Sequence, residues 1–140
     1  AEHTGGVPVD VHLQDILMTP IENASVVVLN FTLQFLSPDQ RQSLINRISE
    51  GLLEGGALII SEKICFEGSR EQADQTAWHH DFKRAQGYSE LEIAQKRNAL
   101  EDVLRPETEA AHFKRLQQAG LSRHYRWFQC FSFASYIAFK

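Results

Sequence analysis

Apolar and polar residues alternate at the start of the chain, between positions 7 and 14, where three valines and a leucine fall on every second position. This spacing is typical of a strand with one covered face, and it predicts a strand that ends at Asp15 and Ile16. Within residues 25–29, the four residues after Ser25 are apolar without a break, as strands covered on both faces are. A second, more deeply buried strand is therefore predicted there.

A helix with clear end signals is predicted after the second strand. Ser37 is a candidate N-cap, Pro38 suits the first helical position, and Gln40 stands three residues after the serine, as in a capping box. Leucine and isoleucine then recur at helical spacing, and the glycine pair at 55–56 predicts the end of the helix. Residues 57–60 are again apolar, and residues 57–64 are predicted to form another buried strand.

The order strand, helix, strand has the length of one right-handed crossover unit, so the two buried strands are predicted to be parallel. Each strand becomes polar at its carboxyl end, the first at Asn30 and the second at residues 61–63. In open α/β sheets, ligands bind outside the carboxyl ends of the strands. We therefore expect Asn30 at the rim of a ligand crevice.

The second half of the chain begins with a helical insertion, predicted for residues 66–105. Two helices are expected in it, roughly at 70–85 and 89–104, and Gly87 separates them. A third helix follows the insertion, between a proline and a glycine. The aromatic-rich end of the chain is predicted to be an antiparallel hairpin. The fold class is thus α/β with a mostly parallel sheet, in a single domain over residues 1–140.

Composition narrows the classes of partner. The net charge of −4 provides no overall positive field for nucleic acid, and no apolar run approaches the roughly 18 residues of a membrane span. Cys65 and Cys130 have neither metal nor redox spacing, so they are predicted to be reduced thiols of a cytoplasmic protein.

Four longer segments, together with the order of elements, resemble one family. The segments are IENASVVVLNFTLQFL, GGALIISEK, HHDFKRAQGYSELEIAQKR and WFQCFSFASYIAFK. They resemble the carboxy-S-adenosyl-L-methionine synthases, within the Rossmann-like class I S-adenosylmethionine-dependent methyltransferase superfamily. The resemblance implies that the family's first strand, glycine-rich loop and ribose-binding acid precede Ala1, so we expect a partial domain from the C-terminal portion. Glu54 departs from the family, which tends to have proline there.

The resemblance also implies an activity. Such an enzyme converts S-adenosylmethionine and prephenate to carboxy-S-adenosyl-L-methionine and phenylpyruvate, and the product serves tRNA wobble uridine modification. We expect no metal, no membrane and no direct nucleic-acid contact, and a homodimer formed through the helical insertion. Two alternatives stay open: a conventional methyltransferase acting on tRNA or a small molecule, and a non-catalytic dimerisation scaffold.

Four residues carry the cofactor expectations that the resemblance implies. Asp15 and Ile16 would bind the adenine edge through a carboxylate acceptor and a backbone N–H donor. Asn30 would hold the ribose or the amino-acid end of the nucleoside. Arg97 would bind the additional carboxylate of the product, because a guanidinium can form two parallel hydrogen bonds with a carboxylate. Their ordinary structural roles would be a loop cap, a satisfied strand end and a solvated helix arginine; the catalytic residues stay unassigned.

Histidines and basic residues in the insertion could each have a functional or a purely structural role. His79 and His80 are adjacent, and adjacent helical side chains point about 100° apart, so they are poorly placed to share a metal. Trp78, Phe82 and Tyr88 are expected to be core or dimer contacts. The basic residues either attract an anionic substrate or are solvated: Lys83, Arg84, Lys96 and Arg97.

Overall fold

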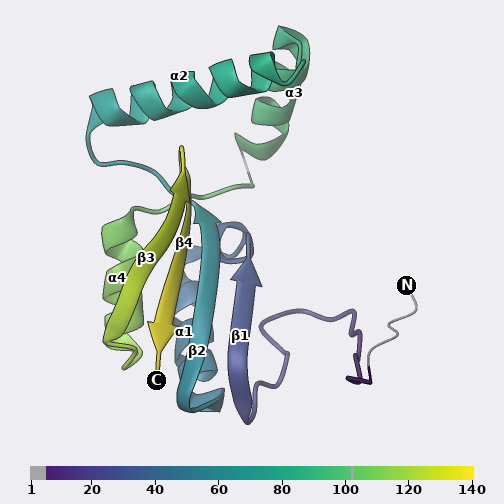
Figure 1. Cartoon of the computed structure of the whole chain (residues 1–140), viewed down its shortest axis with the longest axis vertical. Helices are drawn as coiled ribbons and strands as arrows, with labels where there is room; N and C mark the ends of the chain where they lie inside the picture. Colours follow the sequence, from purple (N-terminus) through teal and green to yellow (C-terminus); the bar gives the residue numbers. More distant parts are fainter. Residues whose placement is uncertain (1–5, 102) are drawn as a thin grey trace.

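A four-stranded sheet organises the chain, and its strand order is β1-β2-β4-β3 (Figure 1). The computed structural model describes residues 6–101 and 103–140. The parallel pairing of β1 with β2 confirms the predicted crossover, and the antiparallel pairing of β3 with β4 confirms the terminal hairpin. The elements are β1 (Ala24–Asn30), the 3-10 helix η1 (Leu33–Phe35), α1 (Pro38–Gly51), β2 (Leu52–Lys63), α2 (Ser69–Ala85), α3 (Glu90–Glu101), α4 (Glu109–Gln118), β3 (Arg123–Cys130) and β4 (Phe133–Phe139).

Helices α1 and α4 lie together on one face of the sheet (Figure 1). The main core lies between them and the strands, where Leu44, Ile48, Leu58 and Leu116 are almost fully buried. This burial follows from the leucine and isoleucine spacing of α1, which gives the helix one apolar side.

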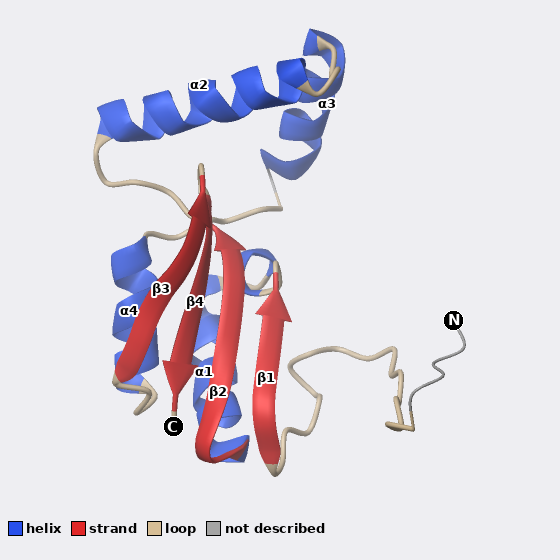
Figure 2. Cartoon of the chain, in the orientation of Figure 1, coloured by secondary structure: helices blue, strands red, loops and turns tan. Residues whose placement is uncertain are grey.

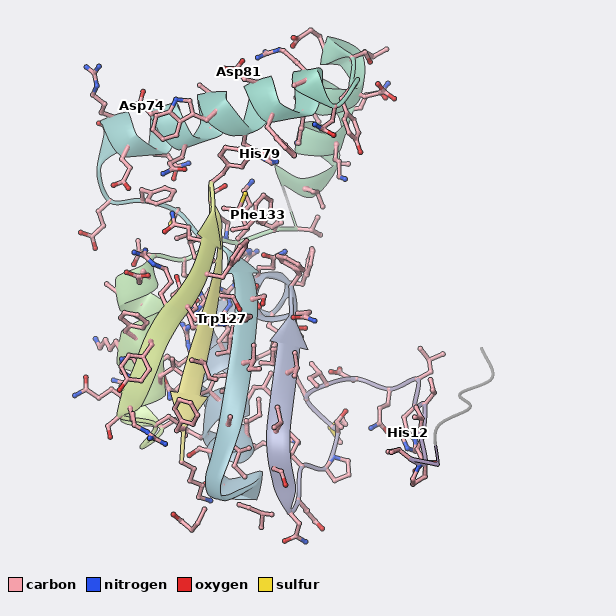
Figure 3. The ribbon with its side chains drawn as sticks, viewed as in Figure 1. His12, Asp74, His79, Asp81, Trp127 and Phe133 are labelled. Atoms are coloured by element: carbon pink, nitrogen blue, oxygen red, sulfur yellow. The ribbon has the colours of Figure 1, made fainter. Side chains whose placement is uncertain are left out.

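The opposite face of the sheet is uncovered by the described residues. Val28 and Tyr125 occupy one cross-strand row on this face and are 50% and 57% exposed. Trp127 of β3 also lies on the outside (Figure 3). The expectation that residues 25–29 are covered on both faces is therefore wrong for this structure, because the helices it describes pack against one face alone.

The predicted strand at residues 7–14 is also wrong. These residues form an extended loop beside β1 (Figure 2), and Val11 and Leu13 are fully or almost fully exposed. Alternation alone does not make a strand, since its backbone N–H and C=O groups need a neighbouring strand. No described strand pairs with this segment.

The helix end predicted at the glycine pair lies elsewhere. Helix α1 ends at Gly51, where an added Cβ would stand 2.1 Å from the Ile21 carbonyl oxygen, so only glycine fits. Gly55 has a φ of 76° and belongs to β2, within an irregularity where the pairing with β1 shifts from Leu52 to Ala57. The glycine pair therefore marks a bulge within a strand.

The two helices predicted within residues 66–105 are present as α2 and α3, which extend across the carboxyl ends of β1 and β2 (Figure 1). Ser89 and Glu92 form a capping box at the start of α3, with the Ser89 N–H donating to the Glu92 carboxylate over 2.9 Å. At α1, Ser37 is the N-cap residue, although its hydroxyl donates to the Gln40 side chain. Among the described residues, none of the helices is long and apolar enough to cross a bilayer.

Candidate functional site

The carboxyl ends of β1 and β2 meet at one edge of the sheet, because the two strands are parallel neighbours with Asn30 opposite Ser61. Beyond this edge the chain turns sharply, as Phe31 has a φ of 52° and its N–H donates to the Ser61 carbonyl over 2.7 Å. Positive φ is costly for a bulky residue and occurs where surrounding structure enforces it. The turn leaves the Asn30 side chain exposed and the Phe31 ring at the border of a cavity.

A buried carboxylate fixes the turn after β1. Glu62, 1% exposed, accepts hydrogen bonds from the backbone N–H groups of Thr32, Leu33 and Gln34 at 2.8–3.1 Å. Burial raises the pKa of Glu62, and these backbone donors, with the Arg41 charge, act against the rise. The sequence showed that β2 becomes polar here, but not that Glu62 holds a loop about 30 residues away.

A second buried group joins the end of the insertion to helices α1 and α4. The Arg41 guanidinium, 1% exposed, lies 2.6 Å from the Glu107 carboxylate, which also accepts two hydrogen bonds from Arg115. Arg41 further donates to the backbone carbonyls of Leu36 and Arg105. Burial alone would raise the pKa of Glu107, but the two guanidinium groups outweigh it and the pKa is lowered. The end of the insertion is thereby held against α1 and α4.

A cavity of about 490 Å³ lies over the strand ends, beneath the insertion. Its base comes from the sheet edge and its roof from α2, α3 and the segment that follows α3. Figure 3 shows His79 pointing from α2 toward Phe133, and the two ring centroids are 5.2 Å apart. The lining residues are Phe31, Gln34, Phe35, Lys63, His79, Lys83, Lys96, Leu100, Leu104, Pro106 and Phe133.

The cavity is cationic and partly apolar. Three lysines line it, and no aspartate or glutamate is among the described residues of its lining. Burial, followed by the ammonium groups of Lys96 and Lys63, lowers the pKa of Lys83. Burial and the nearby lysines also lower the pKa of His79 to about 4, so its imidazole is neutral at pH 7. Such a cavity attracts a small anion that has an apolar body.

Two of the four residues that were expected to bind the cofactor, Asp15 and Ile16, lie on the loop before β1. The Asp15 carboxylate accepts a hydrogen bond from the Leu17 N–H at 2.9 Å, which is the loop-capping role. Ile16 is half-buried and packs against the core. Arg47 of α1 donates to two carbonyls of the same loop, those of Leu17 and Thr19, and so attaches it to the helix. The adenine role of Asp15 and Ile16 stays a prediction.

Arg97 belongs to α3, directly after the cavity residue Lys96, and its side chain lies outside the described part of the chain. Its contact with a carboxylate therefore stays a prediction. Arg84, from the same predicted basic cluster, is instead engaged by Asp81 at 2.6 Å and by Glu90. Within residues 6–101 and 103–140, no group of three or more His, Cys, Asp or Glu side chains could hold a metal ion.

Solved structures identify the class of fold. An O-methyltransferase family 2 protein from Planctomyces limnophilus aligns with a TM-score of 0.62 at 20% identity, over 92% of this chain and 34% of that one. Human N-acetylserotonin methyltransferase, solved with SAM, gives 0.62 at 16% identity, over 92% and 33%. The chain thus has part of the Rossmann-like fold of S-adenosylmethionine-dependent methyltransferases, as predicted. No family model matches the chain.

Curated relatives describe the chain more specifically than the solved structures do. The chain is homologous to the C-terminal portion of carboxy-S-adenosyl-L-methionine synthases. It is 60% identical over 134 residues to the synthase of Geobacter sp. (strain M21) and 56% identical over 134 residues to that of Hahella chejuensis. Each alignment covers 96% of this chain and 55% or 54% of the relative, so the chain spans about half the length of the curated relatives it matches.

Proposed function

We propose that this chain is the C-terminal portion of an enzyme that converts S-adenosylmethionine and prephenate to carboxy-S-adenosyl-L-methionine and phenylpyruvate. The observation that carries the proposal is the identity of 56–60% over 96% of the chain. The cavity at the strand ends supports it, because ligands of open α/β sheets bind at this edge. We place the activity in the cytoplasm and its product in the modification of tRNA wobble uridine.

The proposed chemistry balances as follows. Prephenate loses its ring carboxylate as carbon dioxide and its ring hydroxyl as hydroxide, which leaves the aromatic ring of phenylpyruvate. The hydroxide and one proton of the S-adenosylmethionine methyl group form water. The resulting ylide then forms a carbon–carbon bond to carbon dioxide. Water would quench the ylide, and helices α2 and α3 over the strand ends provide a cover that limits its access.

S-adenosylmethionine would be bound at the exposed edge next to the cavity. Asn30 offers both amide donors and a carbonyl acceptor at the end of β1, which suits the ribose or the amino-acid end of the nucleoside. Asp15 and Ile16 would meet the adenine. The chain's part in this step is to hold and orient the sulfonium nucleoside beside the prephenate carboxylate.

Arg97 would distinguish this reaction from ordinary methyl transfer, because a plain methyl donor has no additional carboxylate for the guanidinium to bind. Hydrogen bonds to charged groups contribute about 1.5–3 kcal/mol. In the protein that carries this sequence together with the preceding half of the fold, we expect Arg97→Ala to reduce carboxylated product roughly 10- to 100-fold, with Arg97→Lys recovering only part.

Mass spectrometry of the nucleoside product measures this outcome. Arg70→Ala is the matched control, since Arg70 lies on α2, is 94% exposed and should leave the yield unchanged. An Arg97→Ala protein that forms carboxylated product at the parent rate would contradict the assignment of Arg97. Absence of carboxylated product from the parent itself would contradict the proposed function.

The same proposal includes a homodimer formed through the insertion. Helix α2 has no buried residue along its 17 positions, and its aromatic side chains Trp78 and Phe82 are 54% and 50% exposed. These two residues are four positions apart and therefore lie on the same side of the helix. A helix of this kind is more stable when a second surface covers its apolar side.

A further inference from the structure

Three ammonium groups converge on the cavity from separate parts of the chain. Lys63 ends β2, Lys83 belongs to α2 and Lys96 to α3. Among the side chains that the structure describes, none of the three has an ion pair. Bringing like charges together in a partly buried site is unfavourable, and a bound anion removes that cost. The arrangement is that of an anion site.

The remaining lining shows what kind of anion fits. Phe31, Phe35 and Phe133 provide aromatic walls, and Leu100 and Leu104 add aliphatic ones. The Phe31 and Phe133 rings meet edge to face with their centroids 6.0 Å apart, so this wall is already formed. A volume of about 490 Å³ is within the ordinary range for small-molecule sites. An inorganic anion would leave these apolar walls without a partner.

We propose that this cavity binds the carboxyl donor of the reaction, a small dicarboxylic acid built on a six-membered ring, and that Lys63, Lys83 and Lys96 bind its two carboxylates. The identity of the donor, its ring and its two carboxylates rest on the proposed function, whereas the binding of an anion with an apolar body rests on the cavity alone. The three lysines are assigned to this ligand and Asn30 to the nucleoside, so the two substrates would meet at Phe31, the residue between the two sites.

Calorimetry with prephenate on the protein that includes the preceding half of the fold tests this assignment. We expect Lys83→Gln and Lys96→Gln each to weaken prephenate binding at least tenfold, because each removes a charged partner of a carboxylate. Lys114→Gln is the matched control, since Lys114 is exposed on α4 and changes the charge equally. It should stay within twofold of the parent. Lys83→Arg retains the charge and should bind more tightly than Lys83→Gln.

Two comparison ligands test the class of anion. Phenylpyruvate has one carboxylate and should bind at least tenfold more weakly than prephenate, and inorganic phosphate should not compete at millimolar concentration. Equal binding of phosphate and prephenate would overturn the proposal, as would prephenate affinity that is the same in Lys83→Gln, Lys96→Gln and the parent. Circular dichroism of each variant separates loss of binding from loss of fold.

The lysine site and the proposed enzymatic activity can be tested separately. Lysine-dependent binding of prephenate without any carboxylated nucleoside would support the site and contradict the activity. Carboxylated product with an unchanged KM for prephenate in Lys83→Gln and Lys96→Gln would support the activity and overturn the site.

Discussion

Acid sensitivity of folding should depend strongly on one buried histidine, His112 of α4. Its ring is 3% exposed, it stacks on Tyr136 with centroids 5.4 Å apart, and neither ring nitrogen has a hydrogen-bond partner among the described residues. Burial, followed by the positive charge of Arg115, lowers the pKa of His112 from 6.5 to about 4. The folded protein therefore holds this imidazole neutral in a pH range where the unfolded chain protonates it.

The sign and size of the effect follow from proton linkage. Because the unfolded state binds the additional proton, the free energy of unfolding should fall as pH drops from about 6.5 toward 4. With those two pKa values, His112 alone accounts for a loss of about 2 kcal/mol at pH 5, and about 3 kcal/mol once pH is below both. His112→Phe keeps an aromatic ring against Tyr136 and removes the titration.

Urea unfolding at pH 7 and pH 5 measures the prediction. The change between the two pH values should be about 2 kcal/mol smaller in His112→Phe than in the parent, and any constant packing cost of the substitution cancels in this difference. His12→Phe is the control, because it makes the same substitution at an exposed histidine on the loop before β1 (Figure 3). An identical pH dependence in His112→Phe and the parent would refute the reasoning.

Three further substitutions test other parts of the structure. Glu62→Gln should cost about 2 kcal/mol in urea unfolding, because an amide replaces a carboxylate that accepts three backbone N–H groups; an unchanged midpoint would contradict that role. Arg41→Met should cost about 3 kcal/mol in the same assay, since it leaves buried carbonyls and part of Glu107 without a partner, and a neutral effect would argue against it. Trp78→Glu should halve the mass measured by light scattering. Thr76→Glu, at a position about 200° away around α2, should leave the mass unchanged. A Trp78→Glu protein with the same mass as the parent would contradict the dimer proposal.

Local signals explain the parts of the fold that the sequence predicted. Pro38 and Ser37 mark the start of α1, Ser89 that of α3, and the aromatic segments at the end form the antiparallel hairpin. Each of these features depends on residues close in sequence. The strand at 7–14 was wrongly predicted for the opposite reason, since a strand depends on a partner that its own residues do not specify.

Features of the site that depend on distant residues were not predictable in the same way. Glu62 binds a turn 28–30 residues before it, and Arg41 reaches the Arg105 carbonyl 64 residues away. Neither pairing has a spacing that a sequence pattern could reveal. The predicted basic cluster overlaps the cavity only in part. Lys83 and Lys96 line the cavity, whereas Lys63, which also lines it, was not included in the prediction.

The two halves of the cavity are anchored unequally. Its base is fixed, because Glu62 holds the turn after β1 and the Gln34 side chain accepts a hydrogen bond from the Lys63 N–H at 2.9 Å. The roof has less support, since α2 buries no residue among the described ones and meets the tip of the β3–β4 hairpin through ring contacts of His79 and Phe82. An anion that contacts Lys63 in the base and Lys83 in the roof would link the two halves. Because ligand binding stabilises whichever arrangement it contacts best, the roof should become more ordered when the site is filled.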